Sequence, residues 1–152
     1  MDKDKVVELA KSYATEGFLC SESVLLAFSD LLGIKNPLIP RVATGFGGGI
    51  CFCGSVCGAI SGGIMALSLK FGRNDAKEQV VNLHRFGHRL VERFEKEFGS
   101  AMCRELTECN FHTEAGRKKY ADEKLWETKC RQYIGSVTAM VFDLISEKNS
   151  QT

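Results

Sequence analysis

The sequence predicts an all-α fold, a single-domain helical bundle in which a glycine- and cysteine-rich loop leads into a buried central helix. Apolar residues recur at helical spacing through most of the chain, and no stretch shows the sustained alternation of a strand. The 152 residues show no repeat, linker or change of composition. With 44% hydrophobic and 26% charged residues, such a chain can bury a substantial core without disulfides. We therefore expect one domain over residues 1–152.

Apolar spacing and capping signals predict the first two helices. Gly17 supplies a stop for the first helix. Ser21 is expected to cap the second helix, with Glu22 in its first turn facing the positive end of the helix dipole, and Gly33 to end it. The apolar face of the first helix consists of Val6, Leu9, Ala10 and Tyr13, and that of the second of Val24, Leu25, Phe28, Leu31 and Leu32.

The middle of the chain combines a glycine-rich loop with an apolar run. The Asn36-Pro37 pair breaks the chain, and a short helical stretch is expected over residues 39–44. Residues 45–57 then hold many glycines and three cysteines, and the apolar run from Gly58 to Phe71 is predicted to be the buried helix. Gly72 ends this run.

The second half of the chain predicts one long helix, one short helix and a last helix. Asp75 and Glu78 have the spacing of a capping box, so the long helix is expected to start at Asn74 or Asp75. A short helix after Gly99 is expected to carry Cys103, whereas the polar residues 110–125 allow no firm assignment. A polar tail follows the last helix. That helix presents Cys130, Ile134, Val137, Val141, Leu144 and Ile145 on one face.

Composition and charge exclude several classes of function. The net charge is +1 and no basic block occurs, so we expect no nucleic-acid partner. Residues 42–69 carry no charge and are long enough to span a bilayer, but their glycine- and cysteine-rich first half indicates a buried helix instead. We expect no membrane association. The N-terminus lacks the features of a secretory signal, which predicts a cytoplasmic location.

A reducing cytoplasm decides how the seven cysteines are interpreted. There, cysteines serve more often as metal ligands or redox thiols than as permanent disulfides. Cys57 stands where the glycine-rich loop enters a helix, so the free N–H groups and the dipole of that helix are expected to lower its pKa. The alternative is tight glycine packing around a buried thiol. The loop lacks the lysine and Ser/Thr of a phosphate-binding loop, so nucleotide binding is not indicated.

Four cysteines on four different predicted elements could converge in one bundle. They are Cys20, Cys57, Cys103 and Cys130. Four thiolates are the usual ligands of an iron–sulfur centre or a structural zinc ion, but the long intervals do not distinguish between the two. Cys51, Cys53 and Cys109 could be further ligands, a resolving thiol for a disulfide, or residues without a role.

Other chemistry-bearing residues have simpler interpretations. His84 and His88 stand at i and i+4, a spacing that can chelate a metal. No third ligand is evident, and both border the apolar stripe of a helix. Trp126 and the phenylalanines are expected in the core.

The segment from Cys57 to Gly62, read as CGAISG, resembles the central motif of the family of redox-active proteins named for the pattern C…GCAxxG…C…C. The upstream glycines 47–49 are similar to that family's glycine run. Cys20, Cys103 and Cys130 fall where its other cysteines belong. The resemblance covers the chain from about Gly17 to the last helix. It implies redox activity, with iron–sulfur or other metal binding by the four shared cysteines.

Three hypotheses follow. The leading one is an electron-transfer or redox-sensing protein in which the four cysteines bind an iron–sulfur cluster, with the backbone N–H groups of Gly58 and Ala59 donating to its sulfurs. The second is a thiol–disulfide oxidoreductase with Cys57 as the catalytic thiol and Cys53 or Cys20 as the resolving thiol. The third is a zinc or copper module on the same thiolates. All three allow a homodimer, and the redox hypotheses require a partner protein that the sequence does not identify.

Overall fold

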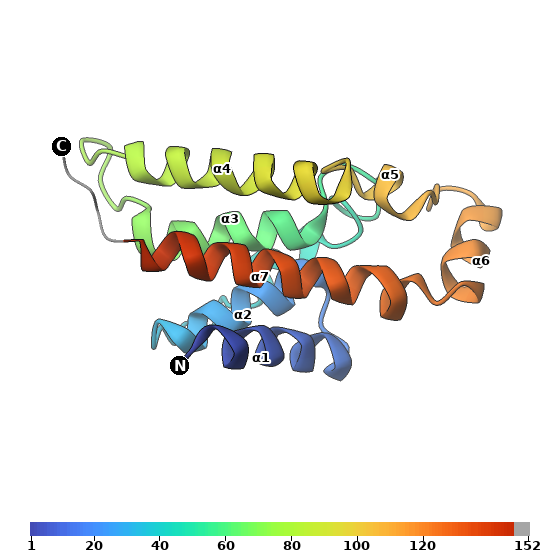
Figure 1. Cartoon of the computed structure of the whole chain (residues 1–152), viewed down its shortest axis with the longest axis horizontal. Helices are drawn as coiled ribbons and strands as arrows, with labels where there is room; N and C mark the ends of the chain where they lie inside the picture. Colours follow the sequence, from blue (N-terminus) through green and yellow to red (C-terminus); the bar gives the residue numbers. More distant parts are fainter. Residues whose placement is uncertain (148–152) are drawn as a thin grey trace.

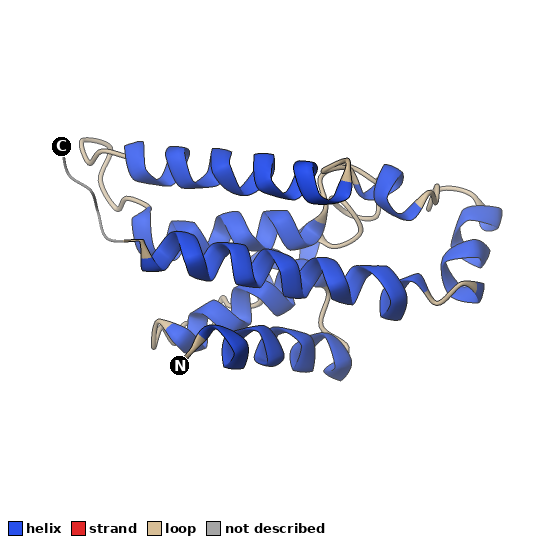
Figure 2. Ribbon diagram, in the orientation of Figure 1, coloured by secondary structure: helices blue, strands red, loops and turns tan. Residues whose placement is uncertain are grey.

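The computed structural model describes residues 1–147, which form helices, turns and loops without a strand (Figure 2). The all-α prediction is thereby confirmed. The polar tail predicted after the last helix lies, from residue 148 on, outside the described residues. The helices are α1 (Lys3–Glu16), α2 (Cys20–Leu31), the 3-10 helix η1 (Arg41–Phe46), α3 (Gly58–Phe71), α4 (Val81–Phe98), α5 (Cys103–Thr107), α6 (Glu114–Asp122), the π-helix η2 (Trp126–Cys130) and α7 (Arg131–Ser146).

The long helices form a bundle around α3, and α5 and α6 extend one end of it (Figure 1). α3 packs against α2, α4 and α7, while α1 covers α2 and α7. The centre of the bundle is apolar, as helix packing requires. Its largest fully buried side chains include Phe28, Phe86, Phe94, Ile60, Leu90 and Ile134. The predicted central helix is therefore found at the centre of the core.

Small residues allow α3 to occupy this central position. A Cβ added at Gly62 would lie 2.5 Å from the carbonyl oxygen of Ser21, so only a glycine lets α2 and α3 approach this closely. The charge-free run that contains α3 is thus accounted for by packing within the bundle. Across the described part of the chain, no helix combines the length and the apolar character needed to cross a membrane.

Two predicted helix starts are wrong. α2 begins at Cys20 with Leu19 as its N-cap, and the Glu22 carboxylate accepts a hydrogen bond from the Leu19 N–H at 2.8 Å. Ser21 lies inside the helix, where its hydroxyl donates to the carbonyl oxygen of Ala43 at 2.7 Å and ties α2 to η1. The capping prediction failed because this tertiary contact competes for the serine side chain.

The long helix α4 begins at Val81, later than the predicted start at residue 74 or 75. The Asp75 carboxylate instead accepts from the Lys77 N–H at 2.8 Å, and the Glu78 N–H donates to the Asp75 carbonyl oxygen at 3.1 Å. These bonds close an isolated turn, because an aspartate two residues before an N–H stabilises a turn as readily as a helix start.

The unassigned polar stretch contains the helix α6. Its N-cap is Thr113, whose hydroxyl accepts from the Gly116 N–H at 3.0 Å, with Glu114 in the first turn. Cys130 was expected on the last helix and instead ends the π-helix η2, directly before α7 begins at Arg131. α6 lies at the end of the bundle that α5 also extends (Figure 1).

Candidate functional site

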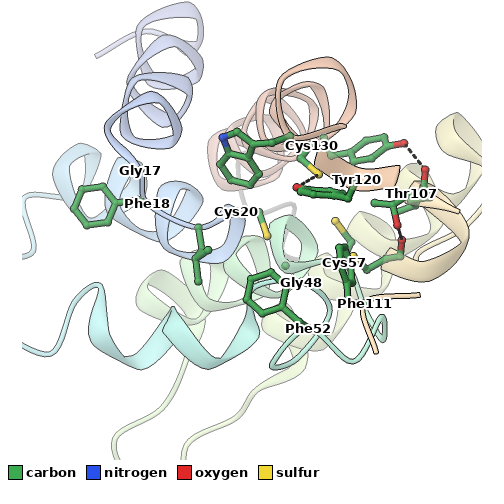
Figure 3. A pocket seen from close by; sticks show the side chains of 16 residues that line it. Gly17, Phe18, Cys20, Gly48, Phe52, Cys57, Thr107, Phe111, Tyr120 and Cys130 are labelled. Carbon is green, nitrogen blue, oxygen red and sulfur yellow. Dashed lines mark hydrogen bonds between the residues drawn. The ribbon is translucent and has the colours of Figure 1, made fainter. Parts of the chain in front are cut away.

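A cavity of about 250 Å³ lies at this end of the bundle (Figure 3). Four of the seven cysteines line it, and each comes from a different element. Cys20 is the first residue of α2, Cys57 the N-cap of α3, Cys103 the first residue of α5, and Cys130 the last residue of η2. The four cysteines that the sequence singled out therefore surround a single cavity.

Backbone pairing explains why Cys57 and Cys103 are neighbours although they are far apart in sequence. An isolated antiparallel bridge joins the two segments. Within it the Cys57 N–H donates to the Ala101 carbonyl oxygen at 2.8 Å, and the Cys103 N–H to the Ser55 carbonyl oxygen at 2.7 Å. Side chains alternate along extended backbone, so Cys57 and Cys103 lie on the same side of the bridge. A pairing this short leaves no periodic signal in a sequence.

Gly58 lets α2 and α3 meet at the cavity. A Cβ at this position would overlap Cys20 Sγ and lie 2.8 Å from the carbonyl oxygen of Phe46. Any side chain here would push the start of α3 away from Cys20. Gly58 therefore has a packing role at the cavity wall, beside the two sulfurs of Cys20 and Cys57.

Burial dominates the electrostatics of the four thiols. It raises the pKa of Cys103 to about 12 and that of Cys130 to about 11, and it also raises the pKa values of Cys20 and Cys57. Negative charge on Cys20, Cys103 or Cys130 raises the pKa of a neighbouring cavity thiol further. Without a bound cation, the cavity thus favours four neutral thiols.

The expectation that the start of α3 lowers the pKa of Cys57 is wrong. Burial raises this pKa by more than the backbone N–H groups of Ala59 and Ile60 lower it. For Cys20 the same balance holds, with burial opposed by backbone hydrogen bonds that include one from Gly58. The backbone N–H of Gly58 is therefore directed at the sulfur of Cys20, and that of Ala59 at the sulfur of Cys57. Ala59 itself does not line the cavity.

Tyr120, on α6, places a hydroxyl against one of the cavity sulfurs. Its Oη lies 3.3 Å from Cys130 Sγ (Figure 3). The ring is held edge-on by Phe111, with centroids 5.2 Å apart. Burial raises the pKa of Tyr120, so the phenol keeps its proton. Sequence reasoning missed this residue because it lies in the unassigned polar stretch, where it is the one aromatic side chain of α6.

Aromatic side chains form much of the remaining cavity wall. They are Phe18, Phe52, Phe111, Tyr120, Trp126 and Tyr133. The prediction that all phenylalanines belong to the core is wrong for Phe52, which is 46% exposed and lies over the cavity from the glycine-rich loop. In the sequence, the position of Phe52 between Cys51 and Cys53 in the glycine-rich loop was the signal that could have placed this ring near the site.

The remaining cysteines and the histidine pair lie outside the cavity lining. Cys51 and Cys53 are exposed, whereas Cys109 is buried and its thiol donates to the Thr107 carbonyl oxygen at 3.3 Å. All seven thiols are free. His88 is exposed and contacts Glu92 at 3.1 Å. Within residues 1–147, no group of three or more histidine, cysteine, aspartate or glutamate side chains is placed so that it could hold a metal ion.

A helical bundle with four free thiols around an apolar cavity at one end defines a class of small all-α proteins with a buried cysteine site. The model of the family described as "Putative redox-active protein (C_GCAxxG_C_C)" matches residues 18–144, and the chain belongs to this family. The matched residues include all four cavity cysteines, which confirms the predicted resemblance. Comparison of the chain with curated proteins and with solved structures found no match.

Proposed function

We propose that this redox-family protein binds an iron–sulfur cluster through the thiolates of Cys20, Cys57, Cys103 and Cys130, for electron transfer or redox sensing. The observation that carries the proposal is the convergence of four thiols, from four separate elements, on one cavity. Four cysteine thiolates are the usual ligand set of both [2Fe–2S] and [4Fe–4S] centres. When bound, such a centre supplies reversible electron uptake at a potential that the protein tunes.

The shape of the site favours a cluster over a single metal ion. A zinc ion requires every ligand sulfur within about 2.3 Å of one point. A cluster instead distributes its thiolates over several irons, so its ligands surround a volume. The four cysteines line a cavity of about 250 Å³ and so surround a volume in this sense, which supports a cluster more than a single ion. A zinc or copper site on the same thiolates has less support.

The backbone N–H groups around Cys20 and Cys57 also support ligation by these thiols. A bound cation reverses the effect of burial and deprotonates a coordinating thiol. The thiolates of Cys20 and Cys57 would then keep the backbone donors already directed at them, including the N–H groups of Gly58 and Ala59. We therefore propose that Gly58 and Ala59 stabilise the sulfurs of the bound group.

A thiol–disulfide mechanism based on Cys57 has less support. The attacking species is an accessible thiolate, whereas Cys57 is 6% exposed and burial raises its pKa. The two candidate resolving thiols also differ in setting, because Cys20 lines the same cavity and Cys53 is on the exposed loop. These features describe a ligand better than a nucleophile.

The decisive experiment is anaerobic purification followed by visible spectroscopy, iron and acid-labile sulfide analysis, and electron paramagnetic resonance in both redox states. We expect brown protein with stoichiometric iron and sulfide. Cys109→Ser is the matched control, since it removes a buried thiol that does not line the cavity. Colourless protein with stoichiometric zinc or copper would favour the single-ion alternative. Metal-free protein with two reversibly oxidised thiols would favour disulfide chemistry.

A redox role also requires a partner protein that exchanges electrons with the site. This partner, the homodimer and the cytoplasmic location stay predictions from the sequence. Size-exclusion chromatography with light scattering would measure the oligomeric state directly.

A further inference from the structure

The four cavity sulfurs have different hydrogen-bond environments. Backbone N–H groups are directed at Cys20 and Cys57. Cys130 instead has a side-chain partner, the hydroxyl of Tyr120 at 3.3 Å. Among the side chains of the described residues, the Tyr120 hydroxyl alone is hydrogen-bonded to a sulfur of the cavity. Cys130 thus differs from the other three cavity cysteines in having a side-chain hydrogen bond, to Tyr120.

The fold holds this contact in place from both sides. Tyr120 belongs to α6, and its ring packs edge-on against Phe111 in the cavity wall. Cys130 ends the π-helix η2 and leads directly into α7. Both residues are partly buried, so water competes weakly for the hydrogen bond and its strength is greater than on the surface.

The other hydroxyl groups of the cavity bond to the backbone. The Tyr133 hydroxyl donates to the Leu106 carbonyl oxygen at 3.4 Å, and the Thr107 hydroxyl donates to the Cys103 carbonyl oxygen at 2.7 Å (Figure 3). Tyr133 therefore lines the same cavity without a hydrogen bond to sulfur. The chain offers it as a matched control for Tyr120.

We propose that Tyr120 is a positioning residue that raises the reduction potential of the site by donating its hydroxyl proton in a hydrogen bond to Cys130 Sγ. The inference rests on the proposed function, with Cys130 as a ligand. A ligating thiolate carries no proton, so the phenol must be the donor. One-electron reduction increases negative charge on the ligand sulfurs, and a hydrogen bond to sulfur stabilises the reduced state more than the oxidised state.

The test compares Tyr120→Phe with Tyr133→Phe in the full chain, each purified anaerobically and titrated on an electrode. Tyr120→Phe is expected to bind the same amount of iron and to shift the one-electron equilibrium about tenfold toward the oxidised state, equivalent to about 59 mV more negative. Tyr133→Phe is expected to leave the potential near that of the unmodified protein. Replacing Tyr120 with 3-fluorotyrosine, a stronger donor, is expected to shift the potential in the positive direction.

Each other outcome overturns the proposal in a distinguishable way. Equal potentials for the two phenylalanine variants would mean that Tyr120 does not tune the site, and the proposed cluster would stand. Lower iron content in Tyr120→Phe than in Tyr133→Phe would assign Tyr120 to assembly instead of tuning. Absence of iron and sulfide from the unmodified protein would overturn both this inference and the proposed function.

Discussion

Cys53 and Cys57 are four residues apart, yet they lie in opposite environments. Cys53 and its neighbour Cys51 are exposed on a loop in which Ile50, Cys51 and Phe52 all adopt positive φ. Cys57 is buried at the N-cap of α3. The left-handed residues turn the loop back on itself, so its thiols face solvent while the chain continues into the core. The comparison teaches that burial in the wall of the cavity, and not spacing along the chain, separates candidate ligands from exposed surface thiols.

Removing one cavity thiol is the strongest way to test this comparison. Cys57→Ser is expected to reduce bound iron and sulfide to background, because a serine hydroxyl is a poor ligand for iron in a cluster. The double variant Cys51→Ser/Cys53→Ser is expected to keep full iron content and an unchanged visible spectrum. Iron and sulfide analysis of anaerobically purified protein measures both. Loss of iron from the double variant would show that the loop thiols also act as ligands.

The two groups of thiols should also differ in reactivity. In metal-free, reduced protein at pH 8, iodoacetamide is expected to alkylate Cys51 and Cys53 on the order of 100-fold faster than Cys57, since only exposed thiolates react without an opening of the fold. Time-resolved peptide mass spectrometry reports each site separately. Fast alkylation of Cys57 would contradict the burial argument and restore the disulfide mechanism.

The raised pKa values predict that metal-free protein loses stability at alkaline pH. The folded state holds the protons of Cys103 and Cys130 more tightly than the unfolded state, where the thiol pKa is 9.0. Their contribution is complete below pH 9 and is lost as pH rises through about 11 for Cys130 and about 12 for Cys103. Each thiol lowers the free energy of unfolding by about 1.4 kcal/mol per pH unit in this window.

Urea denaturation under reducing conditions at pH 8, 9 and 10 measures this loss. Cys103→Ser removes one of the four buried thiols with a raised pKa, and the stability of this variant should fall less steeply between pH 9 and 10. Identical slopes for the two proteins would show that Cys103 does not keep its proton in the folded state.

The smallest expected effect concerns the close contact that buries Cys20. Gly58→Ala is expected to lower the free energy of unfolding by about 1–3 kcal/mol, because its Cβ overlaps Cys20 Sγ and the chain must shift. Gly87→Ala is the control within a helix. Its Cβ would meet only the flexible end of Ile64 at 3.1 Å, and alanine favours the helix by up to about 1 kcal/mol. Equal stabilities of the two variants would contradict the packing role of Gly58.

Periodicity predicted the long helices well and their starting points poorly. The apolar run of α3 and the apolar faces of α1 and α7 are found as expected. The starts of α2 and α4 differ because Ser21 and Asp75 have other hydrogen-bond partners. A capping residue is shared between local and tertiary bonds, and sequence patterns describe only the local ones.

The sequence by itself determined the all-α class, the central helix after the glycine-rich loop, and the family to which the cysteines belong. The tertiary structure alone decided that four thiols share one cavity, that burial raises the pKa of Cys57 instead of the helix lowering it, and that Tyr120 contacts Cys130. The physical reason is that helix formation depends on neighbours within a few residues. Desolvation and sulfur contacts depend on atoms that the chain brings together from α2, α3, α5, α6 and η2.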